Sequence, residues 1–255
     1  MPEHVKVERD GHLMIITLNR PQVRNALHAP ACVEMSAALD ELQSDPELWI
    51  GIITGAGDKA FCSGHDLTDN FFEPMPPTGW AGMAKRTGLF KPIIAAVNGY
   101  ALGGGFEIAL MSDIVVAEER ASFGLSEPRV GFVAAGGGSQ KLPLRVPKAI
   151  AMGMLLTGNR MSAAEAARWG LVNEVVPNGQ SVDAARRWAE QILTCSPAAV
   201  RFTKQIAMLS LEPEVTHQPP FDLVEKIKPV LFALEDTREG MRAFAEKRKP
   251  VWTGR

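Results

Sequence analysis

The 255-residue chain has little cysteine, no long apolar run and almost no net charge. Its cysteines, Cys32, Cys62 and Cys195, lie far apart without CxxC spacing. This argues against a disulfide framework or a cysteine-built zinc site and suits a reducing compartment. No apolar stretch approaches the roughly 18–20 residues that a membrane span needs, and Met1–His12 lacks the apolar core of a signal peptide. We therefore expect a cytoplasmic protein.

The charge balance gives no sign of a macromolecular partner. The formal net charge is −2 at pH 7, and the pI is near 6.2. Such a balance favours neither nucleic acid nor a membrane surface, and the chain has no extended basic run of the kind that RNA binding would require. With 46% apolar and 22% charged residues, the composition is that of a globular protein with a substantial core.

Apolar periodicity predicts an α/β core followed by a helical C-terminal part. Alternation at Val5–Glu8 and an apolar run at Leu13–Leu18, with Gly11 between them, predict a hairpin. Further expected strands are Trp49–Thr54, Pro92–Val97, Ile114–Ala117 and Val172–Val176. Expected helices are Pro30–Ser44, a short one ending at Ser112, Pro147–Leu156, Val182–Leu193, Pro197–Leu209, Phe221–Leu234 and Thr237–Lys247, and Ser162–Glu165 is a capping box.

The most informative stretch is Pro92–Glu107. A β-branched apolar run ends at Val97, and three consecutive glycines, Gly103–Gly105, then precede Glu107. Glycine permits close approach and backbone conformations that other residues avoid, and the first N–H groups of a helix have no partner inside the helix. Such amides can stabilise negative charge on a carbonyl oxygen during a reaction. A glycine triplet by itself more often marks only a tight turn.

Several motifs, in the right order, resemble those of the crotonase family, the enoyl-CoA hydratases and isomerases. The matching segments are Ala60–Leu67, Lys91–Glu107, Ser122–Pro128, Leu156–Arg160 with Ala166–Val172, and Ala243–Arg248. Together they extend the resemblance over nearly the whole chain. The resemblance implies an α/β fold, a crotonase-like spiral of ββα units over residues 1–195. It also implies a helical region over residues 196–255 that builds a homotrimer or a dimer of trimers and covers the active site.

The resemblance further implies an acyl-CoA thioester substrate, with no metal or redox cofactor, since coenzyme A is part of the substrate. Addition of water to an unsaturated thioester places negative charge on the thioester oxygen, which two backbone N–H groups would stabilise. The matching amides are those of His65 and Gly104, and the imidazole of His65 is expected to be incidental. Of the two matching carboxylates, Glu107 would orient and activate water, and Glu127 would protonate Cα, with the roles reversed in dehydration.

The same resemblance places the substrate contacts on a larger set of residues. The expected CoA and substrate contacts are Val23, Arg24, Ala26, Ser63, Gly64, His65, Asp66, Leu67, Gly103, Gly104, Ala135 and Lys247. Lys247 would be supplied by its own or a neighbouring subunit. The acyl pocket is expected from the loop Thr68–Phe90, including Phe71, Phe72, Trp80 and Met83, together with Phe132, although these residues could equally be core or lid packing.

One pair of residues departs from the family pattern. Ala134 and Ala135 stand where a Pro-Gly pair is common, and alanine is disfavoured at positive φ. We therefore expect that either the loop differs here or the reacting water is held less well.

Three functions remain open. The first is enoyl-CoA hydration, or the reverse dehydration, including that of carnitinyl-CoA because Phe244–Trp252 resembles that branch. The second is Δ3,Δ2-enoyl-CoA isomerisation, which needs only one carboxylate, and the third is non-catalytic acyl-CoA binding. The presence of both Glu107 and Glu127 favours the first.

Overall fold

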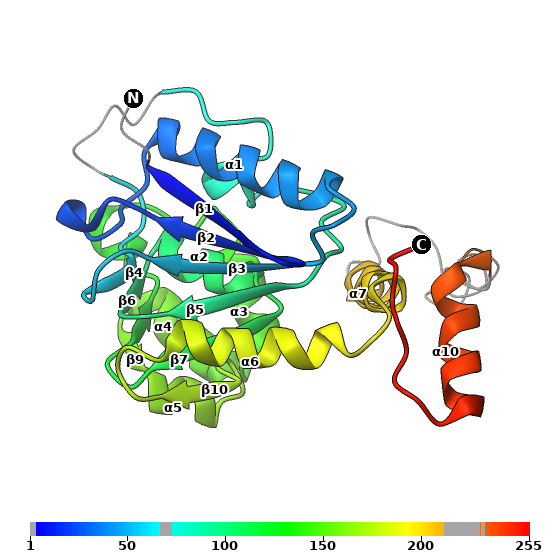
Figure 1. The fold of residues 1–255 in the computed structure, drawn as a ribbon. Coiled ribbons are helices and arrows are strands. Elements are labelled where there is room, and N and C mark those ends of the chain that lie inside the picture. The colour runs from blue at the N-terminus through cyan, green and yellow to red at the C-terminus, as the bar shows by residue number, and fades with distance from the viewer. Residues whose placement is uncertain (1–3, 67–72, 212–229, 231–232) are drawn as a thin grey trace.

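Two β-sheets form the body of the structure, a computed structural model that describes residues 4–66, 73–211, 230 and 233–255 (Figure 1). The larger sheet has the strand order β1-β2-β3-β5-β7-β10, and the smaller has the order β4-β6-β8-β9. The strands are β1 (Val5–Asp10), β2 (Leu13–Leu18), β3 (Ile50–Gly55), β4 (Ala60–Cys62), β5 (Ile93–Val97), β6 (Tyr100–Leu102), β7 (Ile114–Glu118), β8 (Ser122–Gly124), β9 (Arg160–Ser162) and β10 (Glu174–Val176). Apart from the β1–β2 hairpin and the β8–β9 pair, neighbouring strands run parallel.

Helices cover both sheets. They are α1 (Ala29–Ser44), α2 (Gly104–Met111), α3 (Gly138–Arg145), α4 (Lys148–Thr157), α5 (Ala163–Arg168), α6 (Ser181–Leu193), α7 (Pro197–Leu211) and α10 (Glu235–Glu246), with short 3-10 turns η1 (Pro21–Val23), η2 (Trp80–Gly82) and η3 (Glu127–Val130). The predicted hairpin, the capping box and the helices up to residue 211 are confirmed. The helix expected at Phe221–Leu234 lies mostly outside the described residues.

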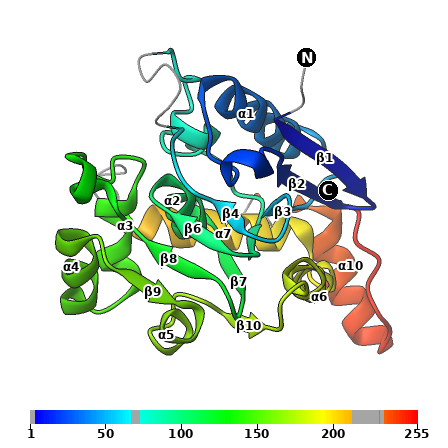
Figure 2. The ribbon, with the colours of Figure 1, turned by 90° about the vertical axis from the view of Figure 1, so that its left-hand side faces the viewer.

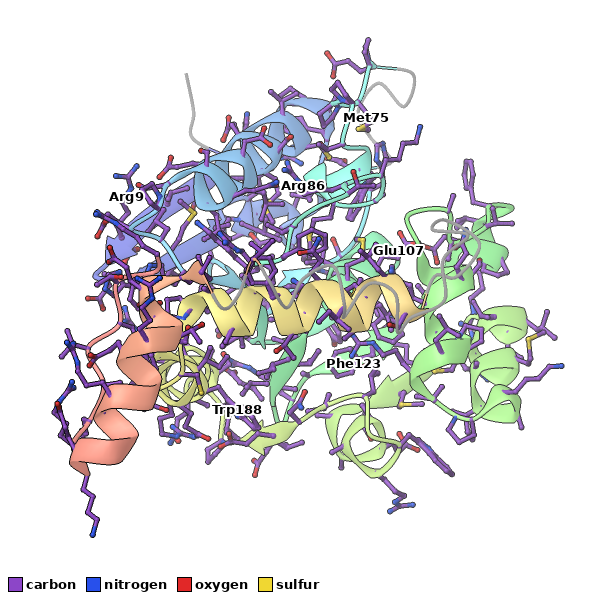
Figure 3. The ribbon with its side chains drawn as sticks, turned by 90° about the vertical axis from the view of Figure 1, so that its right-hand side faces the viewer. Arg9, Met75, Arg86, Glu107, Phe123 and Trp188 are labelled. Carbon is purple, nitrogen blue, oxygen red and sulfur yellow. The ribbon has the colours of Figure 1, made fainter. Side chains whose placement is uncertain are left out.

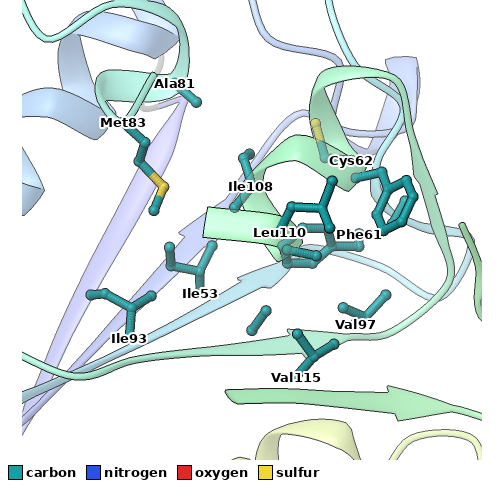
Figure 4. Packing of buried hydrophobic residues seen from close by; sticks show 14 of the residues in the cluster. Ile53, Phe61, Cys62, Ala81, Met83, Ile93, Val97, Ile108, Leu110 and Val115 are labelled. Atoms are coloured by element: carbon teal, nitrogen blue, oxygen red, sulfur yellow. The ribbon is translucent and has the colours of Figure 1, made fainter. Parts of the chain in front are cut away.

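The six-stranded sheet is covered on both faces, as its apolar residues require. Successive side chains of a strand point to opposite faces. In β2, Leu13 and Ile15 pack in the cluster that α6 completes, whereas Met14 and Ile16 pack in the larger cluster with α1 and α2. Figure 4 shows part of this larger cluster, between β3, β5, β7 and α2. A sheet buried on both faces is a rigid platform for the loops at its edge.

The second sheet brings the glycine turn to the site. Figure 2 shows α2 next to β6 and β4, and α2 contacts both strands. Strand β6 lies between β4 and β8 and pairs in parallel with both, so the chain leaves these strands in the same direction. The ends of β4, β6 and β8 therefore lead into neighbouring segments, Ser63–Asp66, Gly103–Glu107 and Leu125–Val130.

Figure 1 shows α7 and α10 beside the two sheets, on the side where α6 ends. The C-terminal segment connects the end of α6 to α10. Trp252 Nε1 donates to the carbonyl oxygen of Thr194 at 2.9 Å, and the N–H of Gly254 donates to the buried carboxylate of Asp236 at 3.0 Å. The division of the chain at residue 195 stays a prediction. Within the described ranges, no helix is both long and apolar enough to cross a membrane.

Candidate active site

A cavity of about 690 Å³ opens between η2, the start of α2 and the segment that follows β8. Most of the residues expected at the reacting centre line it. They are Ser63, Gly64, His65, Gly103, Gly104, Glu107, Glu127 and Ala135. Figure 3 shows Glu107 inside the body of the molecule, with Met75, a residue of another wall of the cavity, above it. The structure thus brings together residues of different segments that lie between 20 positions (Glu107 and Glu127) and 72 positions (Ser63 and Ala135) apart in the chain.

Two glycine-containing segments meet closely at one side of the cavity. A methyl group placed on Gly64 would lie 3.2 Å from the amide nitrogen of Gly104 and 2.9 Å from the carbonyl oxygen of Leu102. Only a glycine at 64, which takes φ of 97°, permits this approach. Gly104 is the first residue of α2, so its N–H has no acceptor within the helix. The backbone of Gly64–His65 and the positive end of α2 therefore lie side by side.

The two glutamates converge on this turn from different elements. Glu107 stands in the first turn of α2 with 4% of its surface exposed, and its Oε1 accepts the N–H of Gly138 at 2.9 Å. Glu127 begins η3, and a methyl group on Gly103 would lie 3.1 Å from its Oε1. The buried Oε2 of Glu127 makes no hydrogen bond with the described residues. Glu127 thus has an oxygen without a hydrogen bond to the described residues, whereas Oε1 of Glu107 is held by the amide of Gly138.

Burial raises the pKa values of both carboxyl groups. It raises the pKa of Glu107 to about 7, an effect that the N–H of Gly138 opposes and the charge of Glu127 reinforces. Burial also raises the pKa of Glu127, against its own backbone N–H. With a pKa of about 7, Glu107 can both take up and release a proton near pH 7, which is what general acid–base catalysis requires, and the raised pKa of Glu127 favours its protonated form.

The raised pKa of Glu107 predicts a pH-dependent stability. Below the unfolded pKa of about 4.5 its contribution is complete, and it is lost as pH rises through the folded pKa of about 7. Glutamine can still accept the N–H of Gly138 but never ionises. We expect Glu107→Gln to match the wild type in free energy of unfolding at pH 4.5 and to exceed it at pH 8 by on the order of 3 kcal/mol.

Urea unfolding of both proteins at the two pH values measures this difference. Glu190→Gln, a change at an exposed carboxylate on α6, serves as the matched control and should not reproduce the gain. An equal free-energy difference at both pH values would show that Glu107 is not a destabilised carboxylate.

Of the two segments expected to hold coenzyme A, Ser63–Asp66 lines the cavity with Ser63, Gly64 and His65, and Val23–Ala26 lies beside that segment. The N–H of Ser63 donates to the carbonyl oxygen of Arg24 at 3.1 Å, which joins the two segments. Asp66 is buried in an ion pair with Arg20 at 2.9 Å, so its side chain holds the loop. Val23, Arg24, Ala26, Asp66 and Lys247 are not among the described residues that line the cavity, and Leu67 lies outside the described residues. Their contacts with coenzyme A stay predictions.

Ala135 does not take the positive φ that alanine disfavours. It is not among the residues with positive φ, whereas Gly137 takes φ of 116°. The loop therefore places its left-handed residue at a glycine two positions later, in line with the first of the two alternatives expected for this pair. Ala135 lines the cavity, and Ala134 is buried beneath it.

The expected acyl-pocket residues divide between the cavity and the core. Trp80 and Phe132 line the cavity. Met83, with 6% of its surface exposed, packs in the larger core cluster, which was the alternative left open for it. Phe71 and Phe72 lie outside the described residues.

Sequence reasoning missed the residues that hold Glu107. The amide of Gly138 binds its Oε1, and a methyl group on Gly136 would lie 2.3 Å from its Oε2. A signal was present, since Gly136–Gly138 is a second glycine triplet and α3 begins at its end. Within the described part of the chain, no three His, Cys, Asp or Glu side chains group as metal ligands would. The expectation that no cofactor is needed stays a prediction.

Known proteins that are similar to this chain match it over its whole length. Residues 8–255 match the family described as enoyl-CoA hydratase/isomerase. A carnitinyl-CoA dehydratase of Salmonella paratyphi A is 43% identical over 262 residues, covering 100% of both chains. Two solved structures also cover 100% of both chains: an enoyl-CoA hydratase from Mycobacterium tuberculosis H37Rv, with TM-score 0.91 and 39% identity, and a carnitinyl-CoA hydratase from Mycobacterium avium, with TM-score 0.79 and 42% identity. The predicted fold class is confirmed, and the assembly that it implied stays a prediction.

Proposed function

Because the chain belongs to the enoyl-CoA hydratase/isomerase family, we propose that it catalyses the reversible hydration of a 2-enoyl-CoA to a 3-hydroxyacyl-CoA. One observation carries the proposal beyond the family. Glu107 and Glu127 line a single cavity and have raised pKa values. Hydration needs a base for water and an acid for Cα, and this cavity supplies two carboxyl groups for these tasks.

The reaction would proceed around the thioester carbonyl. As water adds to Cβ, negative charge develops on the thioester oxygen, and the N–H groups of His65 and Gly104 would stabilise it. Glu107, in its ionised form, would orient the water and accept its proton. Glu127, in its protonated form, would deliver a proton to Cα. The helix dipole of α2, whose positive end lies at Gly104, favours the same charge on the oxygen.

The substrate would be an acyl-CoA thioester whose acyl part enters the cavity. The pantetheine and adenine would run along the joined segments Val23–Ala26 and Ser63–Asp66, with Arg24 near the phosphates. Lys247, which does not line the cavity, would be supplied by a neighbouring subunit in a homotrimer or a dimer of trimers. Coenzyme A would be part of the substrate, and the reaction as proposed needs no metal or redox cofactor.

Dehydration of carnitinyl-CoA is a second candidate, because one full-length relative is named a carnitinyl-CoA dehydratase and another a carnitinyl-CoA hydratase. The chemical apparatus would be the same, and only the acyl group would differ. Isomerisation would need only one of the two carboxylates, and acyl-CoA binding without turnover would need neither.

Incubation of the purified protein with crotonyl-CoA tests the proposal. We expect the absorbance of the conjugated thioester to fall and the product mass to rise by one water molecule. Parallel incubation with carnitinyl-CoA, monitored for a gain in absorbance, tests the second candidate. Conversion of a 3-enoyl-CoA to its 2-enoyl isomer, with no hydration of any 2-enoyl-CoA, would overturn the proposal.

A further inference from the structure

Trp80 lies where the two segments of the candidate oxyanion hole meet. Its indole Nε1 donates to Nδ1 of His65 at 3.3 Å, which ties it to the first segment. Its ring also packs against the start of α2. A methyl group placed on Gly104 would lie 2.3 Å from Cη2 and 2.5 Å from Cζ2 of the ring. The indole therefore fills the space that a side chain at 104 would need, and one residue contacts both segments.

The hydrogen bond fixes the state of the imidazole. An indole N–H can only donate, so Nδ1 of His65 must be the acceptor and the ring proton must lie on Nε2. The side chain of His65 is thus held in one orientation and one tautomer by Trp80. Because a side chain that is held restricts its own backbone, the bond limits rotation of the peptide that supplies the His65 N–H.

Trp80 is itself mounted on a rigid support. Gly82, two residues on, lies so close to α1 that a methyl group there would be 2.6 Å from Cα of Ser36. Arg86 Nε donates to the carbonyl oxygen of Gly82 at 2.7 Å, and its Nη2 donates to that of Ser36 at 3.0 Å. Ala81 adopts φ of 54°, which a non-glycine residue keeps only where its surroundings impose it, and its N–H donates to Sγ of Cys32.

We propose that Trp80 is a positioning residue that ties together the two segments whose amides form the oxyanion hole. The inference rests on the proposed hydration, in which those amides act. An oxyanion hole is effective only when its donors are fixed at hydrogen-bond distance from the developing charge. Trp80 holds the His65 side by a hydrogen bond and the Gly104 side by ring packing, and α1 holds Trp80. The imidazole of His65 then has a role, as the acceptor of the hydrogen bond from Trp80.

A double-mutant cycle tests this proposal. Trp80→Phe removes the donor and also the Cζ2, Cζ3 and Cη2 atoms that pack against Gly104, whereas His65→Ala removes only the acceptor and leaves the backbone amide in place. We expect His65→Ala to lower kcat for crotonyl-CoA hydration by about three- to tenfold, the effect of one hydrogen bond, and Trp80→Phe to lower it by at least as much. KM should stay nearly unchanged, since the lost interaction acts on the transition state. The double variant should be no slower than the slower single variant.

Trp49→Phe is the matched control. The Trp49 indole stacks on the ring of His12 and donates to the carbonyl oxygen of Pro46 at 3.0 Å, but it does not line the cavity. This variant loses a comparable hydrogen bond and should keep its kcat.

Three results would overturn the proposed positioning role of Trp80. They are an unchanged kcat in Trp80→Phe, multiplicative losses in the double variant, and a change confined to KM or to acyl-chain preference, which would make Trp80 only a wall of the pocket. A wild-type protein that hydrates no enoyl-CoA would instead refute the proposed function. The two failures are therefore distinguishable within one experiment.

Discussion

Replacement of Glu127 by glutamine is expected to lower the rate of 2-enoyl-CoA hydration by about 10²- to 10⁴-fold. Glutamine has nearly the shape of glutamate but no proton of suitable acidity, so Cα would lose its proton donor. Burial raises the pKa of Glu127 and so favours its protonated form, and its Oε2 makes no hydrogen bond with the described residues. That oxygen is available to carry the proton.

The loss should appear in kcat, while the affinity for coenzyme A stays close to that of the wild type, because Glu127 would act on the acyl part alone. Glu119→Gln, a change at an exposed carboxylate after β7, provides the control and should leave the rate unaltered. A Glu127→Gln variant with wild-type activity would show that one carboxylate suffices, which is the requirement of an isomerase and not of a hydratase.

A methyl group at position 136 should be nearly as damaging. In Gly136→Ala it would lie 2.3 Å from Oε2 and 2.9 Å from Cδ of Glu107, distances at which the carboxylate must move. Movement would break its bond with the N–H of Gly138 and shift it from the reacting water. Misplacement of a catalytic group by about 1 Å can cost 10²-fold in rate, and we expect a loss in kcat of that order.

Steady-state kinetics and circular dichroism of Gly136→Ala measure the effect and establish that the variant is folded. Gly153→Ala is the matched control, since Gly153 lies within α4 and a methyl group there would meet nothing within 4 Å. Alanine should even stabilise that helix slightly. A folded Gly136→Ala variant with normal kcat would contradict the assignment of Glu107 to the reacting water.

The elements of the large sheet could be predicted because their patterns are long enough to read. The five apolar residues among the six of β2, and the amphipathic faces of α1 and α6, each extend over at least one full period. Strands β4, β6, β8 and β9 have three residues each and pair with partners far along the chain. Such strands carry no periodicity of their own, so they could not be found from local sequence.

The site could be predicted only in part, because local sequence patterns place single residues but not the contacts between distant segments. Glu107 follows a glycine triplet and could be placed at the start of a helix from sequence alone. The distance between Glu107 and Glu127 depends on how β6 and β8 pair, which the sequence does not show. Only the family resemblance indicated that these two glutamates act in one site. The contact between Trp80 and Gly104 depends on how η2 is mounted on α1, which no local pattern reveals. Whether the loop at Ala135 differs from the family pattern could not be decided from sequence, because it depends on which residue takes the left-handed conformation, and in the structure that residue is Gly137.

Hydration of crotonyl-CoA in D₂O tests the central claim most directly, namely that this cavity adds water across a 2-enoyl thioester and protonates Cα. Mass spectrometry and proton NMR of the product locate the new atoms. We expect a 3-hydroxyacyl-CoA with one non-exchangeable deuterium, at Cα, and we expect Glu127→Gln to suppress its formation. Deuterium at the γ-carbon with no hydroxyl at Cβ, or recovery of unlabelled crotonyl-CoA, would contradict it.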